Sequence, residues 1–334
     1  MSSLRSAARD YVTLNRFILE QQQAHPDATG EFSILLAQIG LAAKFVASEM
    51  SQGALAGVLG ATDDVNVQGE VVKKLDVLAN DTFVEVFRYI ELVSTVGSEE
   101  MEIPMHVSAQ GQGGQYLVLV DPLDGSSNID ANGTVGSIFS IRRRHASDGE
   151  IEESDLLRPG SEQVAAGYVL YGPSTMLVYT TGEGTHGFTL DTGIGEFLLT
   201  HHNIRIPDPG RYYGANEARY GHWSPAVRAF VDELRAAEYS SRYSGALVHD
   251  LHRILLEGGL YFYPATSVKP EGKLRLMYEA APLAFVAEQA GGRASNGRER
   301  ILDVQPDGLH QRTPLFIGGR SEVERLDTLM ASMA

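Results

Sequence analysis

The sequence predicts an α/β (α+β) protein built from stacked layers of helix and sheet. Three features of its 334 residues indicate this class. The first 50 residues show apolar positions at helical spacing, residues 164–200 contain short apolar runs about ten residues apart, and helical and strand patterns alternate after residue 206. At roughly 150 residues per domain, this length suggests two domains, for which we expect the bounds 1–203 and 204–334.

Helical patterns dominate the N-terminal quarter of the chain. Apolar residues recur at three- and four-residue steps between Leu4 and Ile18, which is typical of an amphipathic helix. A second helix is expected just after Thr29, a plausible N-cap. The glycine-rich stretch 53–69 has no steady period and predicts a long mobile loop, and a third helix is expected over residues 71–90.

Strand patterns occupy the middle of the chain. The apolar runs at 116–121 and 136–144 predict buried strands, and the runs between residues 164 and 200 are separated by glycine-bearing turns, which predicts an antiparallel meander. The last third is expected to alternate short strands with four helices, near 224–237, 246–257, 274–290 and 321–332.

The composition excludes several classes of protein. With 43% hydrophobic residues and no run near the roughly 20 apolar residues that cross a bilayer, we expect a soluble protein without a membrane span. The first residues carry charges and no continuous apolar block, so we expect a cytoplasmic location. The absence of cysteine excludes thiolate nucleophiles and thiolate metal sites. A net charge of −16 opposes binding to nucleic acid, so an anionic substrate requires metal ions or a local basic cluster.

One segment combines metal and phosphate ligands at the end of a predicted buried strand. Asp121 and Asp124 lie three residues apart with the Leu123 carbonyl between them, and hard cations prefer such oxygen ligands. The backbone N–H groups that follow, which can bind a phosphate, are those of Gly125, Ser126 and Ser127. An ordinary Asp/Gly/Ser/Asn turn is the alternative interpretation.

Four further acids extend this hypothesis. Glu99 and Glu100 follow an apolar run, where two adjacent like charges need either a cation or water; a solvated helix start is the alternative. Glu279 lies within an apolar helix, where a buried carboxylate needs a partner. Asp76 on the third helix is a candidate to orient a water, and a surface helical acid is its alternative.

Basic residues that could hold an anionic substrate are Arg242, Lys273 and Arg275, although a lone Lys or Arg is more often a solvated side chain. Together, the oxygen-donor acids, the absence of thiols and the phosphate-binding turn predict a magnesium site for phosphate-ester chemistry. Two such ions about 4 Å apart would activate water and stabilise the leaving oxygen.

Three motifs carry a specific resemblance: DPLDGSSNID at 121–130, SEE at 98–100 and GKLRLMYE at 272–279. The chain resembles the class I fructose-1,6-bisphosphatases, within the magnesium-dependent, lithium-sensitive sugar and inositol phosphatases, over nearly its whole length. The resemblance implies a layered αβαβα sandwich, hydrolysis of the 1-phosphate of fructose 1,6-bisphosphate, and two or more Mg²⁺ ions, for which Mn²⁺ or Zn²⁺ are possible substitutes. It also implies a homotetramer, in which an arginine matching Arg242 reaches the neighbouring subunit's site.

The resemblance assigns roles to individual residues. The implied metal ligands are Glu99, Glu100, Asp121, Leu123 through its carbonyl, Asp124 and Glu279. The acids implied to deprotonate or position the attacking water are Asp76 and Glu100, with Glu70 where the family usually has an aspartate. The implied substrate-binding residues are Gly125, Ser126, Ser127, Asn216, Arg242, Tyr243, Tyr263, Lys273 and Arg275.

A distant AMP site is also implied, by Thr29, Gly30, Glu31, Ser33, Tyr116 and Arg143. Gln115 departs from that pattern, because the family usually has lysine before the tyrosine, and AMP is therefore only a possible effector. Two alternatives stay open within the superfamily, a sedoheptulose-1,7-bisphosphatase and an inositol-phosphate phosphatase. A phosphate-binding regulator without activity is a third alternative, which the presence of every acid disfavours.

Overall fold

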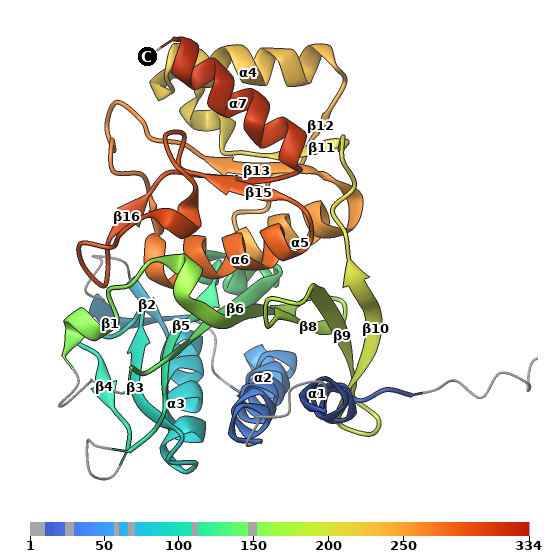
Figure 1. Cartoon of the computed structure of the whole chain (residues 1–334), viewed down its shortest axis with the longest axis vertical. Helices are drawn as coiled ribbons and strands as arrows, with labels where there is room; N and C mark the ends of the chain where they lie inside the picture. The colour runs from blue at the N-terminus through green and yellow to red at the C-terminus, as the bar shows by residue number, and fades with distance from the viewer. Residues whose placement is uncertain are drawn as a thin grey trace, which may run out of the picture.

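The protein is built from five layers, stacked along its long axis in Figure 1. The computed structural model describes residues 11–23, 30–56, 60–65, 71–108, 113–145 and 152–333. In order, the layers are three N-terminal helices, an eight-stranded sheet, two helices, a five-stranded sheet and two outer helices. This αβαβα order confirms the predicted α/β class and the architecture that the resemblance implies.

The first layer contains α1 (Leu14–Gln22), α2 (Glu31–Ala56) and α3 (Lys74–Arg88). The Thr13 side chain accepts a hydrogen bond from the Arg16 N–H (3.2 Å) and caps α1, so the helix begins ten residues after the predicted Leu4. Residues 1–10 lie outside the described residues. The helix α2 begins where the sequence predicts it.

The glycine-rich stretch 53–69 is not a loop throughout, which corrects the sequence prediction. The helix α2 continues to Ala56, and residues 61–65 form β1 (Ala61–Val65), which pairs antiparallel with β2 (Val71–Lys73). The pairing depends on backbone hydrogen bonds, which require no apolar alternation and therefore leave no periodic signal in the sequence. Residues 57–59 and 66–70 lie outside the described part of the chain.

Among the described residues, one helix is long and apolar enough to cross a membrane, a test that the core helix of a layered protein also passes. It is the stretch Glu31–Gln52 of α2, with a mean hydropathy of 1.4. Leu35, Ile39 and Val46 on this helix are fully buried in the hydrophobic core beneath the large sheet. This burial is typical of a core helix in a layered protein.

The large sheet has the strand order β10-β9-β8-β7-β6-β5-β3-β4, and all neighbours are antiparallel except β3 and β5. Helices cover both faces at its centre, which explains the continuous apolar runs of the central strands. The meander predicted over 164–200 is present. The strands are β3 (Val93–Ser98), β4 (Met105–His106), β5 (Tyr116–Asp124), β6 (Val135–Arg143), β7 (Gln163–Tyr171), β8 (Thr175–Thr180), β9 (Thr185–Asp191) and β10 (Glu196–Ile204).

The central helical layer contains α5 (Leu247–Glu257) and α6 (Ala281–Gln289), between the two sheets in Figure 1. A π-helical turn, Leu276–Ala280, leads directly into α6. The predicted helix over 274–290 therefore starts later, because residues 274 and 275 form β14 (Leu274–Arg275), which pairs with β16 (Arg312–Thr313). Single-turn π-helices are frequent at functional sites.

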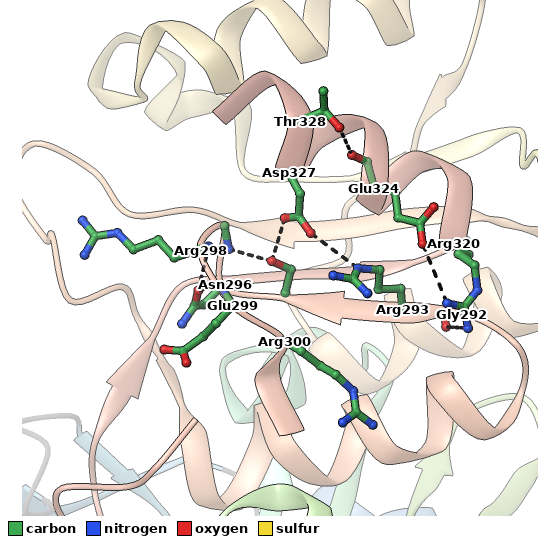
Figure 2. A network of polar contacts seen from close by, with 12 residues as sticks. Gly292, Arg293, Asn296, Arg298, Glu299, Arg300, Arg320, Glu324, Asp327 and Thr328 are labelled. Atoms are coloured by element: carbon green, nitrogen blue, oxygen red, sulfur yellow. Dashed lines mark hydrogen bonds and ion pairs between the residues drawn. The ribbon is translucent and has the colours of Figure 1, made fainter. Parts of the chain in front are cut away.

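The second sheet has the order β12-β11-β13-β17-β15. Its strands are β11 (Tyr212–Gly214), β12 (Ser240–Ser241), β13 (Gly259–Tyr263), β15 (Arg293–Ser295) and β17 (Leu315–Gly318), and the outer helices are α4 (Pro225–Ala236) and α7 (Arg320–Ser332). Figure 2 shows the contacts that attach α7 to β15. Asp327 accepts a hydrogen bond from the Ser295 hydroxyl (2.6 Å) and pairs with Arg293 (3.4 Å).

Candidate active site

Three buried carboxylates converge where β5 meets the π-helical turn. Asp121 and Asp124 lie on the last residues of β5, Glu279 lies on the turn, and one oxygen of each lies within 4.8 Å of the others. Backbone amides fix each group: the Leu123 N–H donates to Asp121 (3.0 Å), the Val248 N–H donates to Asp124 (2.7 Å), and the Arg275 N–H donates to Glu279. We call these three carboxylates the acidic cluster.

The acidic cluster has an electrostatic need for a cation. Burial, and then the charges of Glu99 and Asp124, raise the pKa of Asp121 well above its usual value. Burial raises the pKa of Asp124 to about 7, against the Val248 N–H, which lowers it. Burial and the charge of Asp124 raise the pKa of Glu279 to about 7. Buried oxygen ligands that repel one another are the donor set of a hard divalent cation, so these residues fit such an ion.

Glu99 and Glu100 lie beside the acidic cluster, as the sequence hypothesis required. They follow β3, which is parallel to β5, so both strand ends meet at one edge of the sheet. The Glu99 N–H donates to the Val120 carbonyl (3.0 Å), and the charges of both glutamates raise the pKa of Asp121. Leu123 is buried between Asp121 and Asp124, where its carbonyl oxygen is a candidate additional ligand.

Asp76 is a buried acid at the start of α3, so its alternative interpretation as a surface acid is wrong. Its carboxylate accepts a hydrogen bond from the Lys73 N–H (2.8 Å), which turns the side chain back over the helix N-terminus. Burial raises its pKa to about 7; the charge of Glu100 adds to this effect, and a hydrogen bond with Ser126 opposes it. Asp76 is thus poised to exchange a proton near neutral pH. Glu70 lies outside the described residues.

The phosphate-binding turn follows the acidic cluster directly. Gly125 has a φ of 78°, and a Cβ there would lie 2.4 Å from the Ala246 Cβ, so the position requires glycine. A 3-10 helix, η1 (Ser126–Ala131), begins at the next residue, with Ser126 half-buried and Ser127 exposed. Backbone N–H groups at the start of a helix point out of its N-terminal end along the axis, where they can bind an anion.

A second group of residues lies near the acidic cluster and consists of Asn216, Tyr243, Tyr263 and Lys273; we call it the remote group. Tyr243 makes a side-chain hydrogen bond with Asn216, and burial followed by the charge of Tyr263 raises its pKa to about 12. The Lys273 ammonium lies 5.8 Å from the Tyr263 ring centroid. Lys273 also lowers the pKa of Asp124 and of Glu279, so this remote group and the acidic cluster belong to one site.

The two arginines assigned to substrate occupy different surroundings. Arg242 is exposed, and its guanidinium lies 5.7 Å from the Tyr212 ring centroid. Arg275 is buried, pairs with Glu99 (3.2 Å) and donates to the Lys273 carbonyl (2.8 Å). Arg275 therefore offsets the charge of Glu99 and holds the backbone of Lys273. Its predicted contact with substrate stays a prediction.

The residues implied for AMP lie at the opposite end of β5. Tyr116 and Arg143 are cross-strand partners on β5 and β6, and Phe32 at the start of α2 lies 5.8 Å from Tyr116 between ring centroids. The Ser33 hydroxyl donates to Gln22 (2.7 Å). Gly30 and Glu31 begin α2 at the same place, whereas Thr29 lies outside the described residues.

Sequence reasoning did not single out Asp250, which lies on α5 next to the remote group. This carboxylate is 2% exposed, and both of its oxygens accept from the Ser244 N–H. An acid in the first turn of a helix ordinarily indicates a favourable contact with the helix dipole, so the sequence offers no signal of this interaction.

The layered α/β fold, the buried acidic cluster at strand ends and the adjoining glycine turn are the arrangement expected of a metal-dependent phosphatase.

Comparisons with known proteins identify the family within that class. The family model described as "Fructose-1-6-bisphosphatase, N-terminal domain" matches residues 12–202, and the corresponding C-terminal domain model matches residues 206–331. The class 1 fructose-1,6-bisphosphatase of Nostoc punctiforme is 51% identical over 98% of this chain and 94% of its own length, and that of Synechocystis sp. is 49% identical over 97% and 94%. The crystal structure of Leishmania major fructose-1,6-bisphosphatase in holo form has a TM-score of 0.91 at 40% identity, covering 96% of this chain and 99% of that one. This chain belongs to the class 1 fructose-1,6-bisphosphatase family.

Proposed function

We propose that this protein hydrolyses the 1-phosphate of fructose 1,6-bisphosphate, giving fructose 6-phosphate and inorganic phosphate. The observation that carries the proposal is the link through Lys273, which faces both the acidic cluster and the tyrosines of the remote group. A site with a cation-binding end and a separate basic end suits a substrate with two phosphates. Sugars with a single phosphate leave the remote group without a partner.

The family requires a divalent metal, and we propose Mg²⁺, at two or more ions per chain. Asp121, Asp124, Glu279, Glu99, Glu100 and the Leu123 carbonyl would hold the ions. When bound, the ions offset the negative charge of the phosphate and lower the pKa of water. Mn²⁺ and Zn²⁺ accept the same oxygen ligands and are proposed substitutes.

Residues of this chain carry the proton and orient the substrate. Asp76 takes a proton from the attacking water as that oxygen bonds to phosphorus; the bond from phosphorus to the sugar oxygen breaks, its electron pair stays on the sugar oxygen, and that oxygen takes a proton from solvent water. Glu100 is proposed to assist through its charge on Asp76, and Glu70 to approach the same water. The backbone at Gly125, Ser126 and Ser127 holds the reacting phosphate.

The remote phosphate is proposed to lie against Lys273, Tyr243, Tyr263 and Asn216. Lys273 supplies the charge, and the hydrogen bond between Tyr243 and Asn216 fixes the phenol that donates to a phosphate oxygen. Binding energy from this end orients the reacting end, so it contributes to the rate as well as to affinity.

A substrate comparison tests this function. Phosphate release is measured with fructose 1,6-bisphosphate, sedoheptulose 1,7-bisphosphate and inositol 1-phosphate, each with Mg²⁺ and with a chelator. We expect the highest kcat/KM for fructose 1,6-bisphosphate and no release in chelator. A higher kcat/KM for the seven-carbon bisphosphate or for inositol 1-phosphate would replace the proposed substrate.

We also propose a homotetramer, in which Arg242 contacts the remote phosphate of the neighbouring chain. Large apolar side chains exposed on α1, on α2 and in the β9–β10 turn support an oligomer: Leu19, Ile34, Leu41, Phe45 and Ile194 are each 40% exposed or more. Light scattering during gel filtration measures the mass; a monomer at micromolar concentration would contradict the proposal.

AMP is proposed to bind weakly at the far end of β5, at Thr29, Gly30, Glu31, Ser33, Tyr116 and Arg143. Gln115 precedes Tyr116 and is exposed, and its neutral amide offers the nucleotide phosphate no charge-assisted hydrogen bond.

A further inference from the structure

The segment that carries Arg242 and Tyr243 is held at its start by the Arg242 N–H, which donates to the Tyr213 carbonyl (2.8 Å), and at its end by Ser244. Both carboxylate oxygens of Asp250 accept from the Ser244 N–H, each at 3.1 Å. On the other side, the Asn128 side-chain amide donates to the Ser244 carbonyl (3.1 Å). The backbone on both sides of Ser244 is thus fixed by side chains from α5 and η1.

The same turn of α5 is also attached to the acidic cluster. The Val248 N–H, two residues before Asp250, donates to Asp124 (2.7 Å). Ala246 contacts the backbone of Gly125 so closely that no Cβ fits between them. The first turn of α5 is therefore a rigid spacer, with the acidic cluster on one side and the Tyr243 segment on the other.

We propose that Asp250 is a positioning residue that fixes the distance between the acidic cluster and the remote phosphate-binding group. The inference rests on the proposed function and deepens it, because it names a residue that selects a sugar with a second phosphate at a set distance. Asp250 touches neither phosphate; it acts through Ser244 on Tyr243 and Arg242.

Loss of the Asp250 carboxylate is expected to affect the Tyr243 segment and not the acidic cluster. Without Asp250, the half-buried Ser244 N–H loses its acceptor, whereas the Ser244 carbonyl still accepts from Asn128 and the Arg242 N–H still donates to the Tyr213 carbonyl (2.8 Å). The Val248 N–H still donates to Asp124, because that contact uses the backbone of α5. The remote end of the site is therefore disturbed while the acidic cluster keeps its geometry.

The experiment compares Asp250→Ala and Asp250→Asn with wild type and with Glu257→Ala, a control at the exposed end of the same helix. Each protein is assayed on fructose 1,6-bisphosphate and on fructose 1-phosphate, which lacks the remote phosphate. We expect Asp250→Ala to raise KM for the bisphosphate by ~10- to 100-fold, since a hydrogen bond to a charged group is lost, and to leave kcat/KM for fructose 1-phosphate within about threefold. Asp250→Asn keeps one acceptor oxygen and should recover most of the loss.

Two results would overturn the inference. Equal loss of kcat/KM on both substrates in Asp250→Asn, which retains the side-chain shape, would assign Asp250 a general structural role. An unchanged KM for the bisphosphate in a folded Asp250→Ala would show that the contact positions nothing. Failure of the proposed function is distinguishable, because it would be evident in the wild-type protein as an absence of activity on the bisphosphate.

Discussion

Removal of one charge from the acidic cluster should stabilise the metal-free protein. In Asp124→Asn the amide oxygen still accepts the Val248 N–H, and the side chain keeps its size. The substitution removes the free-energy cost of burying an ionised carboxylate beside other carboxylates. In the wild-type protein this cost is offset when a cation binds to the acidic cluster. The variant therefore separates the electrostatic cost of the site from its packing.

The pKa of Asp124 gives the sign and the size of this effect. Because folding raises this pKa from 3.8 to about 7, the folded state holds a proton that the unfolded state releases between those values. Stability is therefore lost as the pH rises through this interval, and the loss is complete above about pH 7. At 1.36 kcal/mol per pH unit the loss is about 4 kcal/mol, and weakening the hydrogen bond from Val248 returns about 1 kcal/mol.

We expect Asp124→Asn to exceed wild type by ~3 kcal/mol in free energy of unfolding at about pH 8, with the difference gone near pH 4. The measurement is urea unfolding in chelator, followed by circular dichroism at several pH values. Saturating Mg²⁺ should reverse the order, because the ion binds the folded wild type more tightly. A variant that is less stable than wild type by the same amount at every pH would refute the electrostatic reasoning.

Three further predictions concern catalysis and regulation. Asp76→Asn should lower kcat by roughly 10²–10⁴-fold. Wild-type kcat/KM should fall as the pH drops below about 7, since Asp76 must be ionised to accept a proton. A pH profile of kcat/KM that the substitution leaves unchanged would exclude Asp76 as the base. Lys273→Ala should raise KM for the bisphosphate strongly in steady-state kinetics, and any fall in kcat would report binding energy from the remote phosphate that is used in the transition state. An unchanged KM would disprove the contact between Lys273 and the remote phosphate. Gln115→Lys should strengthen AMP inhibition by ~10- to 100-fold in an AMP titration, and micromolar inhibition of wild type, or no gain in the variant, would show that another contact holds the nucleotide phosphate.

The parts of the site that could be predicted from the sequence are those that lie close together along the chain. Asp121, Asp124 and Gly125 occupy adjacent positions at the end of an apolar strand, so their convergence follows from local geometry. The central strands followed similarly from the sequence, because a strand buried on both faces is a continuous apolar run, whereas the αβαβα layer order was implied by the family resemblance.

Contacts between distant segments left no such signal. Asp76 on an amphipathic helix has the pattern of a surface acid, and only the β2–α3 junction turns it inward. Arg275 lies two residues after Lys273 in the sequence, and its ion pair with Glu99, which follows β3, brings together residues far apart along the chain. The segment 61–65 lacks strand periodicity, and its pairing with residues 71–73 is a backbone interaction that needs no apolar alternation.

The central claim is that the carboxylates at the end of β5 assemble the hydrolytic site, and Asp121→Ala tests it most directly. Phosphate release from fructose 1,6-bisphosphate is measured in Mg²⁺ for wild type and for this variant, with the fold of each checked by circular dichroism. The account predicts Mg²⁺-dependent release by wild type and a loss of roughly several powers of ten in the folded variant, because the site loses a ligand of the ions that act on water and phosphate. A folded Asp121→Ala that retains more than about a tenth of wild-type activity would contradict it.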